Sequence, residues 1–140
     1  MAEFHLIRRN LGAALEAAED VRQVHSSVPD SVGIVPAAIV TPGEPAAIYH
    51  RTSSGGYAGL VQFNFDVVLL AYRFGNQHGQ TELDRFIGTD PGSVIDALES
   101  DQTLGDTAKV VKVTEAGDYG QIRVADTDYV GCRFIVEVHA

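Results

Sequence analysis

The sequence has very little cysteine: Cys132 is the only one among 140 residues. A single cysteine excludes a disulfide within the chain and a zinc site of the usual cysteine-rich kind. Cys132 shares one face of an alternating segment with Val130 and Phe134. Reactive cysteines occur in exposed, electropositive surroundings, so this setting predicts a buried structural thiol rather than a nucleophile.

Long apolar runs are also missing. The longest, VVLLAY at residues 67–72, is far shorter than the ~20 residues that cross a bilayer. The first residues, MAEFHLIRRNLG, contain no apolar stretch long enough for a signal peptide. We therefore expect a soluble protein without a membrane partner.

Cations are scarce, with 10 Lys and Arg against 19 Asp and Glu and a formal net charge of −9. A protein that grips nucleic acid needs a cationic patch, so this balance argues against that class. It is compatible with a protein that lets DNA slide past, because an acidic surface repels phosphate.

Motifs for catalysis, metals and cofactors are absent too. The five histidines lack metal-ligand spacing, and the glycine-bearing segments SSGG and GTDPGS lack the lysine of a phosphate-binding loop. The carboxylates of Asp126 and Asp128 alternate as in a calcium loop, but without its glycine and distant glutamate; a turn is favoured. Glu82 and Asp84 would not face each other on a helix. The sequence thus predicts no catalytic residue, no metal, no cofactor and no enzyme.

What is present fits one domain over residues 1–140, long enough for its own core. Apolar residues at helical spacing predict a helix over residues 3–25, with Asn10 as an alternative N-cap because Gly12 weakens the helix. A short strand at residues 36–41 then ends at Pro42 and Gly43. Residues 44–59 are expected to form a long flexible connection.

Alternation of apolar residues predicts a long strand over residues 60–74, apolar on one face and initially polar on the other. Residues 81–101 read as two short helices or one bent helix, with Thr81 and Asp90 as caps. Three strands at residues 110–114, 120–124 and 129–138 would form a meander. The prediction is an α+β fold with a largely antiparallel sheet, the N-terminal helix and the short helix pair packing on one face.

The turn SDQTLGD, at residues 100–106, carries an apolar residue among polar ones. We predict that Leu104 folds back to cover the end of the preceding helix, near Leu98. Gly105 would let the chain turn toward the following strand.

The long connection also carries residues suited to protein contacts, namely Tyr49, His50, Arg51 and Tyr57. Long loops in compact domains are often functional, so these four are candidate subunit contacts. A mobile loop on an ordinary surface is the alternative that the residues leave open.

Seven segments, in order, resemble the tail terminator proteins of long-tailed, non-contractile bacteriophages, the lambda-like family and its actinobacteriophage relatives. They are PAAIVTPG, YHRT, GLVQFNFDVVLLAYR, TELDRFIG, SVIDALESDQTLGD, VVKVTEAGDYGQIRV and DYVGCRFIVEVHA. The resemblance covers nearly the whole chain and contains structural signatures, with no motif for a functional residue.

The resemblance implies a virion protein, assembled in the host cytoplasm and located in the tail or neck. Members form a ring, usually a hexamer, that caps the tail tube, stops its polymerisation and meets the head-side connector. Genomic DNA passes through the lumen without specific binding. The implied partners are other copies of the chain, the tube protein and the connector or stopper. A head–tail stopper, a tube subunit and a small non-phage binding domain or enzyme are the alternatives.

Overall fold

The computed structural model describes residues 3–18, 21–26, 29, 32–51, 57–73, 83–84, 86–89 and 93–140. For residues 50, 51, 57–60 and 73 it describes the backbone only. The elements are α1 (Phe4–Leu15), β1 (Gln23–His25), β2 (Ala37–Arg51), β3 (Tyr57–Arg73), α3 (Val94–Glu99), β4 (Val110–Val124) and β5 (Thr127–His139). Residues 83–84 and 86–87 are helical as well.

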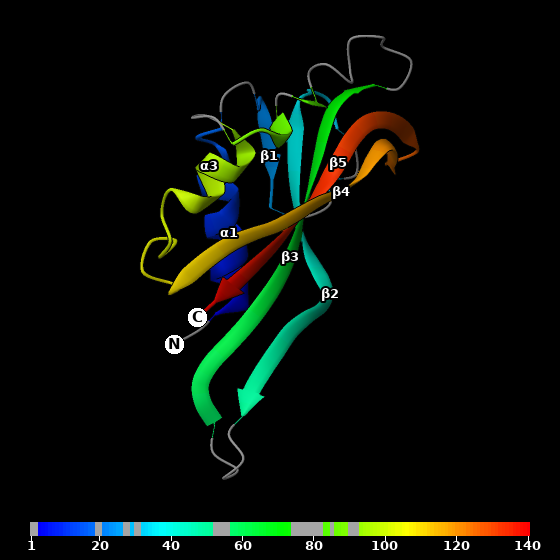
Figure 1. Cartoon of the computed structure of the whole chain (residues 1–140). Helices are drawn as coiled ribbons and strands as arrows, with labels where there is room; N and C mark the ends of the chain where they lie inside the picture. Colours follow the sequence, from blue (N-terminus) through cyan, green and yellow to red (C-terminus); the bar gives the residue numbers. More distant parts are fainter. Residues whose placement is uncertain are drawn as a thin grey trace.

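The strands form one sheet in the order β1-β2-β3-β5-β4. β1 pairs with β2 in parallel, and the other three pairs are antiparallel. Helices α1 and α3 lie together on one side of this sheet, while β2 and β3 run on beyond the other elements (Figure 1). The predicted α+β fold is therefore confirmed.

The main core lies between the helices and the sheet. Phe63, Phe65 and Leu69 of β3 and Phe134 of β5 point into it, as their alternation predicted. Side chains of α1 and α3 close it from the other side, with Ile7, Leu11, Leu15 and Leu98 fully buried. Cys132 is also fully buried in this cluster, as predicted for a structural thiol.

The expected helix over residues 3–25 is too long. It ends at Leu15, and residues 23–25 form β1, which pairs with residues 37–39 of β2. Gly12 lies under this returning chain: a Cβ there would sit 3.6 Å from Ser26 Cβ and 3.7 Å from Val24 Cγ1. Val21, the last residue of the apolar spacing that predicted the longer helix, packs on the core from outside α1. Asn10 is inside α1 and is not its N-cap.

The expected loop at residues 44–59 is wrong as well. Strand β2 continues to Arg51, and β3 already starts at Tyr57. Proline and glycine at residues 42–45 resembled a strand end, but the sheet accommodates them in a bulge. Residues 43–46 oppose only Asn64, since Pro42 pairs with Phe65 and Ala47 with Phe63. Asn64 Nδ2 donates a hydrogen bond to the Pro45 carbonyl at 2.9 Å, which holds this bulge.

The expected three-strand meander is a two-strand hairpin. β4 is continuous from Val110 to Val124, and the predicted turn at residues 115–120 consists of irregularities within it. Asp118 (φ 52°) and Gly120 (φ 138°) adopt positive φ there. Such residues produce bulges that bend a strand without reversing it. The second predicted turn is confirmed: Ala125 and Asp126, with φ of 51° and 63°, connect β4 to β5.

The N-cap of α3 is Ser93, whose Oγ accepts a hydrogen bond from the Asp96 amide at 3.1 Å. The predicted cap at Asp90 is therefore wrong, and Thr81, Asp90 and Pro91 lie outside the described residues. Leu104 is buried with 3% of its surface exposed and belongs to the same core cluster as Leu98, so its predicted burial is confirmed.

Candidate interaction surfaces

The far end of the β2–β3 hairpin extends beyond the rest of the sheet (Figure 1). We call its residues 47–51 and 57–60 the arm. The two strands of the arm are paired in antiparallel, with His50 opposite Leu60 and Arg51 opposite Tyr57. Tyr49 pairs with Val61, the next residue of β3. Residues 47–51 and 57–59 of the predicted loop thus belong to a projecting β-ribbon, and residues 52–56 lie outside the described part of the chain.

Both edges of the arm lack a neighbouring strand in the part of the chain described. On one side, β5 ends where Val61 and Ala140 exchange two hydrogen bonds of 3.3 and 2.9 Å. On the other, β1 pairs only with residues 37–39 of β2. A two-stranded hairpin by itself is marginally stable in water, so the arm has the properties of an element that another surface covers.

The arm exposes apolar side chains on both of its faces. Tyr49 is 61% exposed and Ile48 is 37% exposed. Successive residues of a strand point to opposite faces, so these two cannot shield each other. Of the four predicted contacts, the structure shows Tyr49 at the surface and brings the backbones of His50, Arg51 and Tyr57 to the same end of the hairpin.

The outer edge of β4, in contrast, is covered at its start. The Val111 amide donates to Gln102 Oε1 at 3.1 Å, and the Val113 amide donates to Glu99 Oε2 at 3.0 Å. Both acceptors precede β4 in the chain, in α3 and the turn after it. Side chains that occupy edge amides prevent another strand from pairing there. Nothing in the sequence pattern identified these two contacts.

Farther along β4, Tyr119 is tied to the helical segment before α3. Its hydroxyl donates to Asp84 Oδ1 at 2.7 Å. This hydrogen bond to a carboxylate raises the pKa of Tyr119 above its ordinary value. Side chains of preceding segments thus contact β4 at both of these places, whereas no described strand pairs with either edge of the arm.

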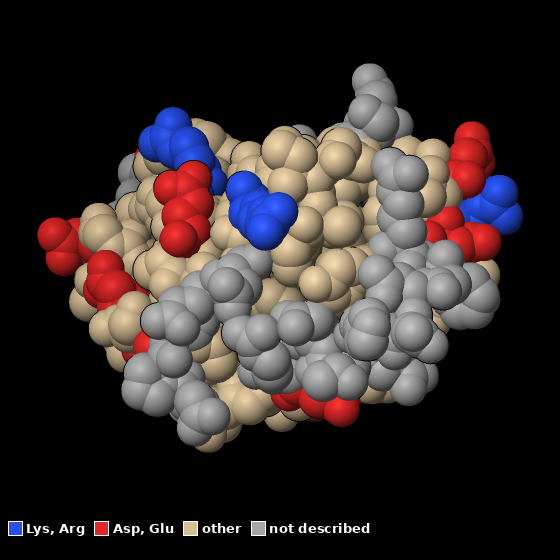
Figure 2. Space-filling view, turned by 90° about the horizontal axis from the view of Figure 1, so that it is seen from above, with Lys and Arg blue, Asp and Glu red and all other residues tan. Residues whose placement is uncertain are grey.

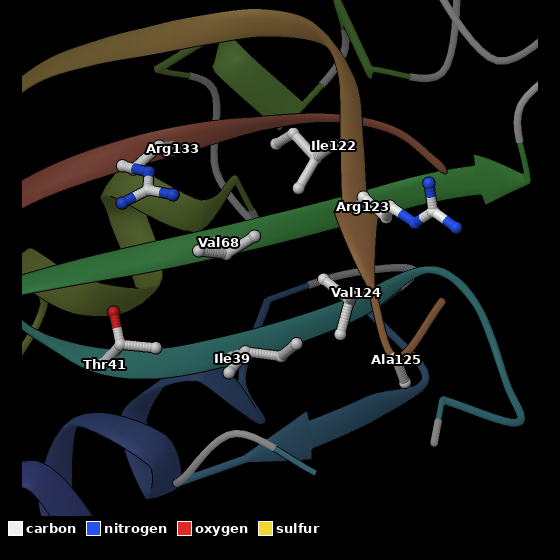
Figure 3. Close-up of a pocket in the computed structure, with 8 residues that line it drawn as sticks. All are labelled: Ile39, Thr41, Val68, Ile122, Arg123, Val124, Ala125 and Arg133. Carbon is white, nitrogen blue, oxygen red and sulfur yellow. The ribbon is translucent and has the colours of Figure 1, made fainter. Parts of the chain in front are cut away.

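A hollow of about 260 Å³ lies on the face of the sheet opposite α1 and α3, the helix-free face in the part of the chain described. It is lined by Ile39, Thr41, Val68, Ile122, Arg123, Val124, Ala125 and Arg133. Figure 3 shows its four larger apolar side chains converging from three strands, with the Arg123 guanidinium extending away from them at the rim. The hollow thus has an apolar floor and a partly polar rim.

The wall of the hollow is fixed by charge pairing. Arg133 Nη1 lies 2.9 Å from Asp66 Oδ2, and Arg133 Nε lies 3.3 Å from Asp118 Oδ2. The Asp118 contact connects β5 to the irregular part of β4. Together the two contacts link β5 to β3 and to β4 beside the hollow.

Chemistry at other groups is limited. Burial raises the pKa of the Cys132 thiol to about 12, so the nucleophilic thiolate is scarce at neutral pH. Among the residues described, no three or more His, Cys, Asp and Glu side chains are grouped so as to hold a metal ion. Within the same part of the chain, no helix is long and apolar enough to cross a membrane.

The charged side chains visible in Figure 2 are of both signs. On the described part of that face, Lys and Arg side chains lie beside Asp or Glu. A cation next to an acid attracts phosphate only weakly, because the acid offsets its field.

Comparison with models of protein families, and with curated proteins, found no match.

Proposed function

We propose that the chain is a structural virion protein that forms a ring on the tail tube of a long-tailed bacteriophage. The ring, hexameric in the family that the sequence resembles, stops tube polymerisation and joins the tube to the head-side connector. The arm is the observation that carries this proposal, because a projecting two-stranded ribbon with exposed Tyr49 and Ile48 suits contact with another copy. On this proposal the protein is not an enzyme and takes no cofactor.

The charge balance supports the same assignment. A net charge of −9 disfavours binding of phosphate, so DNA can pass through the lumen without being held. The protein partners are then the tube protein and the head-side connector or stopper.

The direct test is binding to uncapped tail tubes of the phage that encodes the chain. The purified protein is mixed with these tubes, and tube ends and tube lengths are recorded by negative-stain electron microscopy. We expect rings at one end and arrested growth. A chain that stays monomeric at high concentration and leaves the ends bare would overturn the proposal.

Two variants connect this test to the arm. Tyr49→Asp places a charge where contact is expected and should abolish ring binding, whereas Tyr49→Phe should preserve it. Gln121→Asp, a change at an exposed position of β4, is the matched surface control. Spontaneous growth of the chain into tubes would indicate a tube subunit instead, and binding only to the connector would indicate a stopper.

A further inference from the structure

A closed ring needs two different surfaces on each copy. Head-to-tail contacts between unlike surfaces close into rings, whereas a self-complementary patch gives a dimer. The arm supplies one surface, and its acceptor must lie elsewhere on the chain. We propose that the hollow on the helix-free face of the sheet receives Tyr49 from the arm of the next copy; this inference rests on the ring proposed above.

The size of the hollow favours a side chain as its occupant. Sites for small molecules enclose about 300–1,000 Å³ and bury most of the ligand. The hollow, at about 260 Å³, is smaller and open to solvent. One large side chain delivered on a strand fits such a depression better than a free ligand.

The floor is part of a second core that the chain covers only in part. Its buried members include Ile39, Val68 and Tyr129, and the Tyr129 hydroxyl donates to the Val32 carbonyl at 3.2 Å. Ile122 and Val124, which close this cluster from β4, are only partly buried. A partly open apolar cluster gains stability when another apolar surface removes it from water.

Tyrosine matches this lining in chemistry as well as size. Its ring can pack on the apolar floor while its hydroxyl stays at the polar rim. Arg123 is exposed at that rim, where a guanidinium can donate to a hydroxyl oxygen or lie against an aromatic ring. Tyr49 is the most exposed large hydrophobic side chain that the structure describes.

The test is disulfide crosslinking between copies in rings assembled on tube ends. The native Cys132 is buried and should remain unreactive, so introduced cysteines report alone. Chains with Tyr49→Cys are mixed with an excess of chains carrying Ala125→Cys at the rim of the hollow, whose own Tyr49 maintains most contacts of the ring. We expect a disulfide-linked dimer of the two variants on a non-reducing gel. In the matched control, Tyr49→Cys with Glu115→Cys, a position on β4 outside the lining, should give less than a tenth of that product.

The outcomes separate this inference from the proposed function. Rings that form on tubes but crosslink only between two copies of Tyr49→Cys would show arm-to-arm pairing and overturn the hollow as acceptor, leaving the tail cap standing. Rings in which both mixtures crosslink equally would overturn it too. Tube ends that the parent chain, with Tyr49 intact, leaves without rings would overturn the proposed function and this inference together.

Discussion

Leu104 contributes to the fold through both its side chain and its backbone. The side chain is buried in the main core, and the residue has a φ of 48°, which leucine rarely adopts. Its carbonyl accepts hydrogen bonds from Asn10 Nδ2 at 2.9 Å and from Thr107 Oγ1 at 2.7 Å. The turn is thereby attached to α1, so an apolar residue in a polar turn has a structural explanation.

We expect Leu104→Ala to lower the free energy of unfolding by about 2–5 kcal/mol, the range for removing a buried leucine side chain. Leu104→Asp should lower it further, because an unpaired charge would be buried. Urea denaturation measures both. Leu104→Met, which preserves the volume, should cost less than about 1.5 kcal/mol. Equal stability of Leu104→Asp and the parent chain would contradict the burial.

Asp101 organises the same turn from outside. Its Oδ1 accepts hydrogen bonds from the Thr103 hydroxyl at 2.7 Å and the Thr103 amide at 3.0 Å, and its Oδ2 accepts one from the Gly105 amide at 3.1 Å. The Thr103 hydroxyl contributes most to lowering the pKa of Asp101 below its ordinary 3.8, followed by the backbone amides.

The lowered pKa of Asp101 sets the direction of its pH dependence. A carboxyl whose pKa is lower in the folded than in the unfolded state stabilises the fold above the unfolded value, and this contribution is lost as pH falls through the folded value. We therefore expect the stability difference between the parent chain and Asp101→Asn to shrink below about pH 4. Urea midpoints from pH 6 to pH 2 measure it. Asp106→Asn, in the same exposed turn, is the control, and a pH-independent difference for Asp101→Asn would contradict the assignment.

At the scale of elements, the free edges of the sheet differ in what covers or interrupts them. The start of β4 has its outward amides occupied by Gln102 and Glu99, and β1 is only three residues long. Prolines and a bulge interrupt β2 before the arm. Short edges, prolines and bulges all discourage pairing with other chains. Among the residues that the structure describes, no strand lies beside either edge of the arm, which distinguishes it from the body of the sheet.

Removing both covering side chains with Glu99→Ala and Gln102→Ala should expose the β4 edge. We expect a loss of about 1 kcal/mol per hydrogen bond and aggregation that increases with protein concentration. Urea denaturation and light scattering report the two effects. The double variant Glu99→Gln with Gln102→Glu keeps both oxygen acceptors and should remain close to the parent chain. An Ala variant that neither loses stability nor aggregates would show that these contacts do not protect the edge.

At the scale of the whole molecule, one sheet separates two cores of unequal completeness. The helices seal the larger cluster, whereas the smaller one is covered by the segment before β2 and by the curved β4–β5 hairpin, and it opens into the hollow. The arm extends away from both. The molecule thus presents a projecting element and a partly open depression, which is the arrangement that head-to-tail assembly requires.

Hydrogen exchange should detect assembly at the arm. In the free chain we expect amides of residues 48–49 to exchange rapidly, because in the described part of the chain no strand pairs with the outer edge of this part of β2. On ring formation their exchange should slow at least tenfold, measured by mass spectrometry of peptides spanning residues 44–51. Peptides from residues 132–138 of β5, already buried, should not change. Equal exchange of the arm in free chain and ring would exclude it from the interface.

The sequence pattern alone predicted which side chains of β3 and β5 face the core. Phe63, Phe65 and Leu69 alternate with polar or differently packed residues, and a period of two specifies a strand wherever it occurs. The same alternation placed Cys132 in the core. Leu104 was predicted to be buried because an apolar side chain in a polar turn gains stability when it leaves water.

Only the tertiary structure decided how strands end and what covers them. Gly43 and Pro45 resemble the start of a loop, yet residues 47–51 continue the strand because β3 lies alongside and pairs with them. The contacts of Glu99 and Gln102 with β4 amides, and the lining of the hollow, join segments that are separate in the chain. Strand pairing and the capping of edge amides depend on which segments are neighbours in space. Those neighbours are set by the complete fold and not by the local sequence pattern.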